Sequence, residues 1–363
     1  THDQSSAASD VYKRQPEIHK ELELGIEAKF FKNRVGVDVS LYTKDSEDLI
    51  IDLDLDNSTG YSSSTVNSAS INNKGVEAIL NVIPVQSRDF TWDVSASFSL
   101  LRSEVISIAD GIDQIYVGGY VGRGNIAIPG LPYGILEGEV IRRDYGSLDG
   151  TDHTQVHWDD RTNYTPIVNA NGGYQFLGYG VIGNPQPDFV YGVTNTLSYK
   201  WATLRVQFDS QVGGDVFSTT NSTLLGRGIL QETDFDRFVP VVTKGLSADG
   251  TPNTTQTTAN AHYWPNTGVF YDENSIYDAS VMRLREVSLS FVAPKSFLNG
   301  TPFGNASLTL SAQNIWHYAW NTPSGTNFDP EVISYGAGSN ARGFDEMTGP
   351  TAKKYGATLS LTF

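Results

Sequence analysis

The stretch at residues 21–42, ELELGIEAKFFKNRVGVDVSLY, decides how this chain folds. Apolar and polar residues alternate from Leu22 to Phe30, and after a short turn they alternate again from Val35 to Leu41. Successive side chains of a β-strand point to opposite faces, so each run reads as a strand with one apolar and one polar face. We therefore expect a long antiparallel hairpin.

The same alternation recurs along the chain and predicts about nine strands, or ten if residues 133–143 add to the count. These strands are nearly as long as a tilted transmembrane β-strand, which needs roughly 9–11 residues to cross a bilayer. The connections alternate between short and long, which is typical of outer-membrane barrels with short periplasmic turns and long extracellular loops. This order puts Phe363 on the periplasmic side. The long connections are expected at residues 43–74, 101–188, 213–285 and 313–354.

Charge placement supports a transmembrane β-barrel. Every charged residue of the clearest strands falls on the polar face, where a watery lumen hydrates it, whereas a Lys or Arg facing lipid costs about 2–4 kcal/mol. We expect four of these residues to face the lumen, where they contact cargo or hydrate the wall: Asp38, Asp93, Arg205 and Asp209. Aromatic residues beside the short turns predict an interfacial girdle.

Composition excludes other classes of protein. The chain has 363 residues, a formal net charge of −16 and no cysteine, so it has no disulfide scaffold and no thiolate zinc site. An acidic excess argues against a nucleic-acid partner, because Lys and Arg supply the affinity for phosphate. No run approaches the ~18 apolar residues of a transmembrane helix.

The strand count bears on domain organisation. A bacterial single-chain barrel closes with an even number of strands, so nine strands predict the C-terminal portion of a larger barrel. Residues 1–15 show neither periodicity nor the apolar core of a signal peptide. We interpret residues 1–15 as a non-native or disordered leader and residues 16–363 as barrel.

Candidate sites are few. Aromatic residues at the extracellular ends could stack on sugar rings or peptide side chains, or could simply pack the loops together. They are Tyr116, Tyr120, Trp158, Trp264, Trp316 and Trp320. Asp149 and Asp152 lie in an Asp-rich loop that could bind calcium, or that could be a solvated acidic loop, since it lacks the EF-hand pattern. No catalytic motif stands out, so we expect no enzyme and no other cofactor.

Several stretches of the sequence resemble one known family and occur along the chain in the same order as in that family. They are residues 16–50 and 71–84, LPYGILEG at 131–138, GNPQPDFVYGVTNTLSYK at 183–200, QVGGDVF at 211–217, DASVMRLREVSLSF at 278–291, AQNIW at 312–316 and the terminal TLSLTF. Together they are similar to the C-terminal barrel half of the SusC/RagA-like TonB-dependent outer-membrane transporters.

The resemblance implies a barrel of about 22 strands in the cell outer membrane, of which this chain would hold 9–10. It also implies an absent N-terminal plug through which TonB–ExbB–ExbD acts, and a SusD-like surface lipoprotein as partner. The implied cargo is an oligosaccharide or, less often, a peptide. Phe363, an aromatic residue ending an alternating strand, looks like the signal read by the barrel-assembly machinery.

Two other functions remain open from the residues. The first is a passive porin or an adhesin on a similar barrel. The second is a secreted all-β protein that binds or cleaves glycans, since 41 acidic residues leave any catalytic carboxylate pair unidentified.

Overall fold

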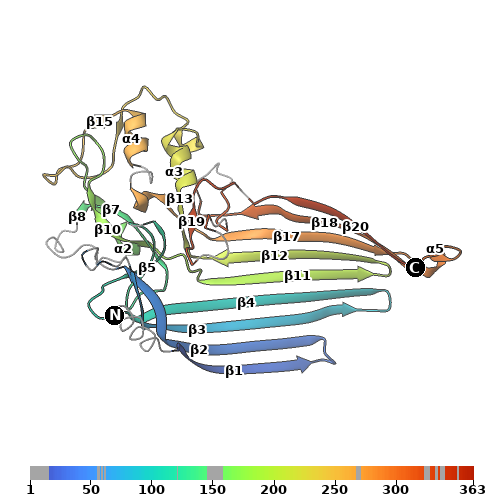
Figure 1. Ribbon diagram of the computed structural model, residues 1–363. Helices are drawn as coiled ribbons and strands as arrows, with labels where there is room; N and C mark the ends of the chain where they lie inside the picture. The colour runs from blue at the N-terminus through green and yellow to red at the C-terminus, as the bar shows by residue number, and fades with distance from the viewer. Residues whose placement is uncertain are drawn as a thin grey trace.

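The computed structural model describes residues 16–54, 58, 60, 63–120, 122–144, 158–266, 271–322, 328–331, 334–335, 340–349 and 351–363. Its main element is one nine-stranded antiparallel sheet in which neighbouring strands follow chain order (Figure 1). The strands are β1 (Ile18–Phe30), β2 (Val35–Asp54), β3 (Ser63–Gln86), β4 (Phe90–Ser107), β11 (Phe189–Tyr199), β12 (Ala202–Val212), β17 (Val281–Val292), β18 (Asn305–Tyr318) and β20 (Lys354–Thr362). The predicted nine antiparallel strands are confirmed.

The two ends of this sheet differ, as Figure 1 shows. Short turns join β1 to β2, β3 to β4 and β11 to β12 at one end, and β17 turns into β18 there through the short helix α5 (Lys295–Leu298). Phe363 lies at this same end, as predicted, with its ring 5.2 Å from that of Phe303. The long connections β4–β11, β12–β17 and β18–β20 leave from the other end.

The connection expected at residues 43–74 is mostly strand, which corrects the prediction. Strands β2 and β3 are 20 and 24 residues long and stay paired up to Asp54 and Ser63. This outer part is rich in Ser, Asn, Thr and Asp and has no continuous apolar face. Its backbone hydrogen bonds persist without apolar alternation, and Ile51 packs against a buried cluster of Val105, Ile115 and Ala127.

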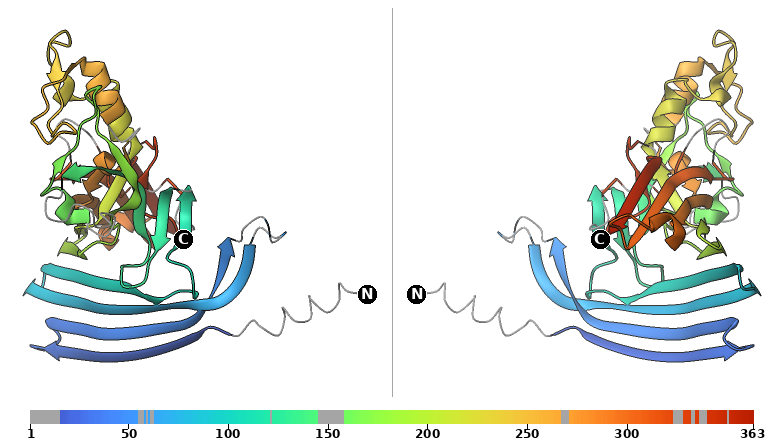
Figure 2. Two further views of the ribbon diagram at one scale, coloured as in Figure 1. Left: turned by 90° about the vertical axis from the view of Figure 1, so that its left-hand side faces the viewer. Right: turned by 90° about the vertical axis from the view of Figure 1, so that its right-hand side faces the viewer.

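The two faces of the sheet have opposite chemistry. Register aligns Leu24, Leu41, Val76 and Leu100 in one row across β1 to β4, and the apolar face to which they belong is largely exposed. The opposite face carries the charged and hydroxyl side chains. The sheet is curved (Figure 2), and the long connections gather at one of its ends (Figure 1). Among the described residues, no helix is both long and apolar enough to cross a membrane.

The three long connections fold together into one unit, which we call the cap. It holds a four-stranded sheet in the order β10-β7-β6-β5 and a three-stranded sheet in the order β16-β13-β19. Its strands are β5 (Ile115–Tyr120), β6 (Arg123–Ala127), β7 (Ile135–Ile141), β8 (Arg143–Asp144), β9 (Thr165–Pro166), β10 (Phe176–Gly183), β13 (Asp215–Ser218), β14 (Val241–Val242), β15 (Gln256–Thr257), β16 (Ile276–Asp278) and β19 (Phe344–Asp345). Its helices are α2 (Trp158–Arg161), α3 (Thr219–Gly226), η4 (Gln231–Thr233), α4 (Ala259–Asn266) and η5 (Asp272–Ser275).

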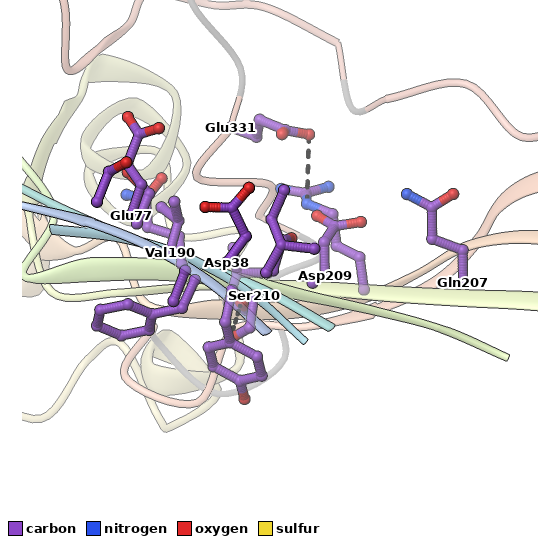
Figure 3. A pocket seen from close by; sticks show the side chains of 18 residues that line it. Asp38, Glu77, Val190, Gln207, Asp209, Ser210 and Glu331 are labelled. Carbon is purple, nitrogen blue, oxygen red and sulfur yellow. Dashed lines mark hydrogen bonds and ion pairs between the residues drawn. The ribbon is translucent and has the colours of Figure 1, made fainter. Parts of the chain in front are cut away.

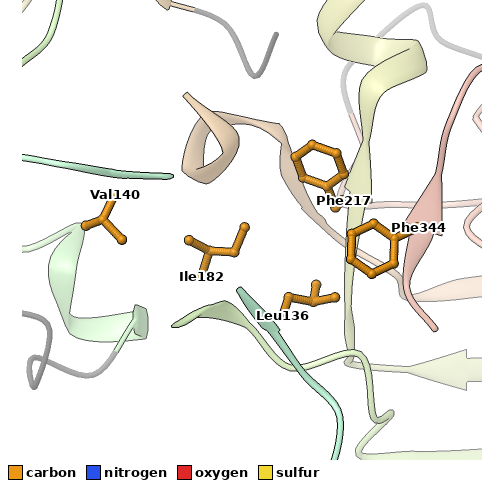
Figure 4. Packing of buried hydrophobic residues seen from close by; sticks show 5 residues of the cluster. All are labelled: Leu136, Val140, Ile182, Phe217 and Phe344. Carbon is orange, nitrogen blue, oxygen red and sulfur yellow. The ribbon is translucent and has the colours of Figure 1, made fainter. Parts of the chain in front are cut away.

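A hydrophobic cluster holds the cap together (Figure 4). It takes Leu136, Val140 and Ile182 from the first long connection, Phe217 from the second and Phe344 from the third, and all five are buried. Strand β13 of the second connection also pairs in parallel with β19 of the third. The long connections are therefore parts of one packed structure.

Candidate functional site

A cavity of about 590 Å³ lies on the polar face of the sheet. Residues of β2, β3, β4, β11, β12 and β17 line it, and Glu331 of the last long connection lines it as well. In Figure 3 the side chains of Asp38, Glu77, Asp209 and Gln207 rise from one side of the strands, the side where Glu331 lies. The wall of this cavity thus combines carboxylates with apolar side chains such as Ile79 and Val190.

A second cavity of about 430 Å³ adjoins the first, because both are lined by Ser99 and Val190. It continues past Leu101 and Ser103 of β4 to cap residues that include Tyr133, Pro187 and Arg342. The two cavities thus follow one another along the polar wall of the sheet toward the cap.

The register places the four predicted lumen residues on one face. Asp38 and Asp209 share a row that runs through Ile79, Ser97 and Gly192. Asp93 and Arg205 share another row, since both pair with Thr196. Asp38 and Asp209 line the first cavity, whereas the other two lie four residues, about 13 Å, nearer the short turns. Contact of any of them with cargo stays a prediction.

Two arginines of β17 were not predicted as site residues. Arg285 binds Asp209 through Nε at 2.7 Å and Nη2 at 2.6 Å, and it binds Glu331 through Nη1 at 3.0 Å and Nη2 at 2.8 Å. A bulge in β17, between the partners of Gln207 and Phe208, interrupts the alternation here. That interruption removes the period-2 signal by which the other wall residues were found.

The neighbouring Arg283 forms a buried pair with Asp329. Its two Nη atoms donate to the two carboxylate oxygens of Asp329, and Thr351 donates to one of them as well. Burial alone would raise the pKa of Asp329, but the hydrogen bonds from Arg283 and Thr351 lower it to about 2. These two arginines tie the last long connection to the wall of the sheet.

Two of the predicted aromatic residues lie at the end of β18, one inside the strand and one just after it. Trp316 pairs with Leu284, which pairs with Phe208 of the apolar face. Its ring stacks on Tyr318 with centroids 6.5 Å apart. This position is typical of a membrane-interface girdle, and contact of Trp316 with substrate stays a prediction. Trp320 lies just beyond the end of β18 and is exposed.

The remaining predicted aromatic residues are spread over the cap. Tyr116 and Tyr120 lie in β5, at its second and last residues. Trp158 begins α2 and packs against the buried cluster of Ile126, Ile135 and Val181. Trp264 lies in α4, with the Arg227 guanidinium 4.4 Å from its ring centre. Neither cavity is lined by Tyr116, Trp158, Trp264, Trp316 or Trp320, the predicted aromatic residues whose side chains the structure describes.

The predicted calcium ligands Asp149 and Asp152 lie outside the described residues. In the part of the chain that the structure does describe, no group of three or more His, Asp or Glu side chains is arranged to hold a metal ion.

The fold and its polar wall agree with a family comparison. The family model described as "TonB dependent receptor-like, beta-barrel" matches residues 5–209. The chain belongs to this family of outer-membrane β-barrel proteins, whose members are receptors and transporters. The resemblance to SusC/RagA-like transporters is confirmed.

Individual relatives agree with this assignment. Two TonB-dependent receptors of Formosa agariphila, P3 and P26, are each 26% identical over 96% of this chain and 34% of their own length. The TonB-dependent receptor SusC of Bacteroides thetaiotaomicron is 22% identical over 74% of this chain and 25% of its own. A solved structure of the RagAB peptide transporter has a TM-score of 0.66 at 20% identity, over 96% of this chain and 35% of that one. The chain thus spans about a third of the length of P3, of P26 and of the RagAB transporter chain.

Proposed function

We propose that this chain forms the wall and cap of an outer-membrane importer that takes up an oligomeric nutrient, with an oligosaccharide as the first choice of cargo. The observation that carries the proposal is the pair of neighbouring cavities along the polar face, one on the strands and the next reaching the cap. An importer needs a hydrated route for its cargo. Because the chain belongs to the TonB-dependent receptor family, we take TonB as the source of energy. Catalysis has no place in this proposal, and neither has a cofactor.

Partners follow from the same proposal. TonB–ExbB–ExbD would drive transport through a plug, a SusD-like lipoprotein would cover the cap, and the barrel-assembly machinery would read Phe363. The relatives include the TonB-dependent receptor SusC, and the likeness to SusC/RagA-like transporters is what suggests the SusD-like partner. The RagAB structure is of a peptide transporter, so peptide stays the second cargo class.

Uptake of labelled oligosaccharides and peptides by cells tests the proposal. We expect accumulation of one class to require both this gene and TonB, because a plugged barrel passes cargo only when it is energised. Uptake that needs the gene but not TonB would instead identify a passive porin. Cells that accumulate every tested cargo equally with and without the gene would overturn import altogether.

A further inference from the structure

The short-turn end of the nine-stranded sheet carries an excess of positive charge (Figure 1). This end consists of residues 30–35, 84–90, 199–202, 292–305 and 362–363, all of which the structure describes. Its cations, which we call the basic rim, are Lys32, Arg34, Arg88, Lys200 and Lys295. Against them stand the side chain of Asp89 and the α-carboxylate of Phe363. This end is therefore positive although the whole chain has a net charge of −16.

No carboxylate of a described residue pairs with the cations of the basic rim. Arg34 donates to two backbone carbonyl oxygens at 2.7–3.0 Å, and these neutral acceptors leave its charge uncompensated. The Lys200 ammonium lies 5.3 Å from the centre of the Tyr199 ring. The other three cations are exposed and form no ion pair with the described part of the chain: Lys32, Arg88 and Lys295. The charge of the rim is thus available to an anion outside the chain.

Two of the tight turns hold lysines in a strained backbone conformation. Lys32 has a φ of +59° and Phe31 before it has +53°, while Lys200 in the β11–β12 turn has +51°. Bulky residues rarely adopt a positive φ, and Gly or Asn is the usual residue of such turns. Strained positions that keep an unfavourable residue point to a function for its side chain. Here the side chains kept in this way are two lysines and an aromatic ring.

Exposed aromatic rings accompany the basic rim. Phe31 is 76% exposed, Phe297 is 77% exposed and Phe363 is 86% exposed. Trp201 is half-exposed beside Phe291, with ring centroids 5.6 Å apart. Rings in this position lie at the level of the lipid headgroups in outer-membrane barrels. Because the sheet crosses the membrane, its short turns emerge at the periplasmic leaflet, where the cations reach the phosphate groups.

We infer that the basic rim selects anionic phospholipids, represented by phosphatidylglycerol, from the periplasmic leaflet of the outer membrane. A phosphodiester is a charged acceptor for Lys and Arg, and each cation near an anionic membrane surface strengthens binding roughly fivefold. The acyl chains of the same lipid cover the neighbouring rings. A soluble anion would meet the cations but would leave the rings in water. The inference concerns the membrane and is independent of the proposed cargo.

Quenching of tryptophan by brominated lipids tests the basic rim. The full-length protein is reconstituted into vesicles of brominated phosphatidylglycerol and phosphatidylcholine in varied proportion. Trp201, next to Lys200, is the reporter, and comparison with a Trp201→Phe variant isolates its signal. We expect the binding constant of phosphatidylglycerol relative to phosphatidylcholine to exceed about five at low salt. This ratio should approach one in about 0.5 M NaCl, because salt screens exposed charges.

Charge variants show whether the lysines of the turns cause the preference. Lys32→Gln combined with Lys200→Gln should lower the ratio about fivefold, whereas the corresponding double change to Arg should keep it. The matched control, Arg142→Gln with Lys244→Gln, neutralises two exposed cations of the cap and should leave the ratio unchanged.

Three results would overturn the inference. They are a wild-type ratio near one, an unchanged ratio in the double Gln variant of the turns, and an equal loss in the cap control. If inorganic phosphate abolishes the preference at matched ionic strength, the rim binds a free anion and the lipid assignment is wrong.

Discussion

At the scale of residues, two carboxylates of one connection bind neighbouring arginines in different surroundings. Asp329 is buried with Arg283, whereas Glu331 is 45% exposed beside Arg285. Breaking a buried pair leaves an uncompensated charge in a poorly solvated site, but an exposed pair exchanges readily for water. The two contacts should therefore differ in their contribution to stability.

Replacing Arg283 tests the buried pair. We expect Arg283→Ala to lower the free energy of unfolding by about 3–5 kcal/mol, since Asp329 then stays buried without its partner. Glu331→Gln should lower it by less than about 1 kcal/mol. Urea unfolding in detergent measures both, and Arg205→Ala, which removes a polar-face arginine for which the structure shows no ion pair among the described residues, is the control. Equal effects of Arg283→Ala and Glu331→Gln would contradict the assignment.

A second residue-scale prediction concerns pH. Burial, opposed by a hydrogen bond from the Asn184 backbone N–H, raises the pKa of Asp215 from 3.8 to about 6, and the charges of three other aspartates add to the rise. The folded state thus favours the neutral carboxyl. Its contribution, at most about 3 kcal/mol, is fully present below pH 3.8 and is lost as the pH rises through about 6.

Asp215→Asn should flatten this dependence, because an amide keeps an acceptor for the Asn184 N–H and does not ionise. The measurement is hydrogen exchange of the β13 amides at pH 5 and pH 8, compared with Asp38→Asn on the wall of the sheet. Wild-type protection that is the same at both pH values would argue against a raised pKa.

At the scale of elements, alternation predicted the strands well where one face meets lipid, as in β1, β11 and β12. Alternation failed to predict strands where the two faces of a strand do not differ in polarity. The outer halves of β2 and β3 carry polar residues on both faces, and the bulge at Arg285 shifts the period of β17. Pairings between cap segments far apart in the chain, such as β13 with β19, have no local signal at all. Sequence periodicity thus predicted the wall and missed most of the site.

Pairing of β2 with β3 requires a glycine at one point. Tyr42 and Gly75 are direct partners, and a Cβ at Gly75 would overlap the Tyr42 ring. We expect Gly75→Ala to cost about 1–3 kcal/mol, because the ring must move. Tyr42→Ala combined with Gly75→Ala should recover most of this loss in a double-mutant cycle followed by thermal unfolding. Strictly additive effects would show that the ring does not lie on this glycine.

At the scale of the whole molecule, the cap depends on contacts between three long connections. Phe217 and Phe344 are buried against each other with ring centroids 5.7 Å apart, and both pack on Leu136 of the first connection. Removing one ring leaves a cavity that the other two connections border. Such a change should therefore destabilise all three connections of the cap. It should leave the nine-stranded sheet intact, because backbone hydrogen bonds between its strands hold it together.

Phe217→Ala tests this cooperation. We expect it to destabilise the cap by about 3–5 kcal/mol and to expose protease sites in the first and third connections as well as in its own. Intact cells treated with protease supply the measurement, and Phe238→Ala is the control, since it removes a ring outside the cluster. Cleavage confined to the second connection would mean that the connections fold independently.

The shared cluster also constrains how such a protein changes its cargo over time. A new surface on one connection must still fit Leu136, Phe217 and Phe344, which the other connections supply in part. Exchanging a single connection between relatives would separate a core residue from its partners, whereas exchanging the three together would keep them. Recombination that preserves the whole cap is thus the route by which specificity can diversify on an unchanged wall.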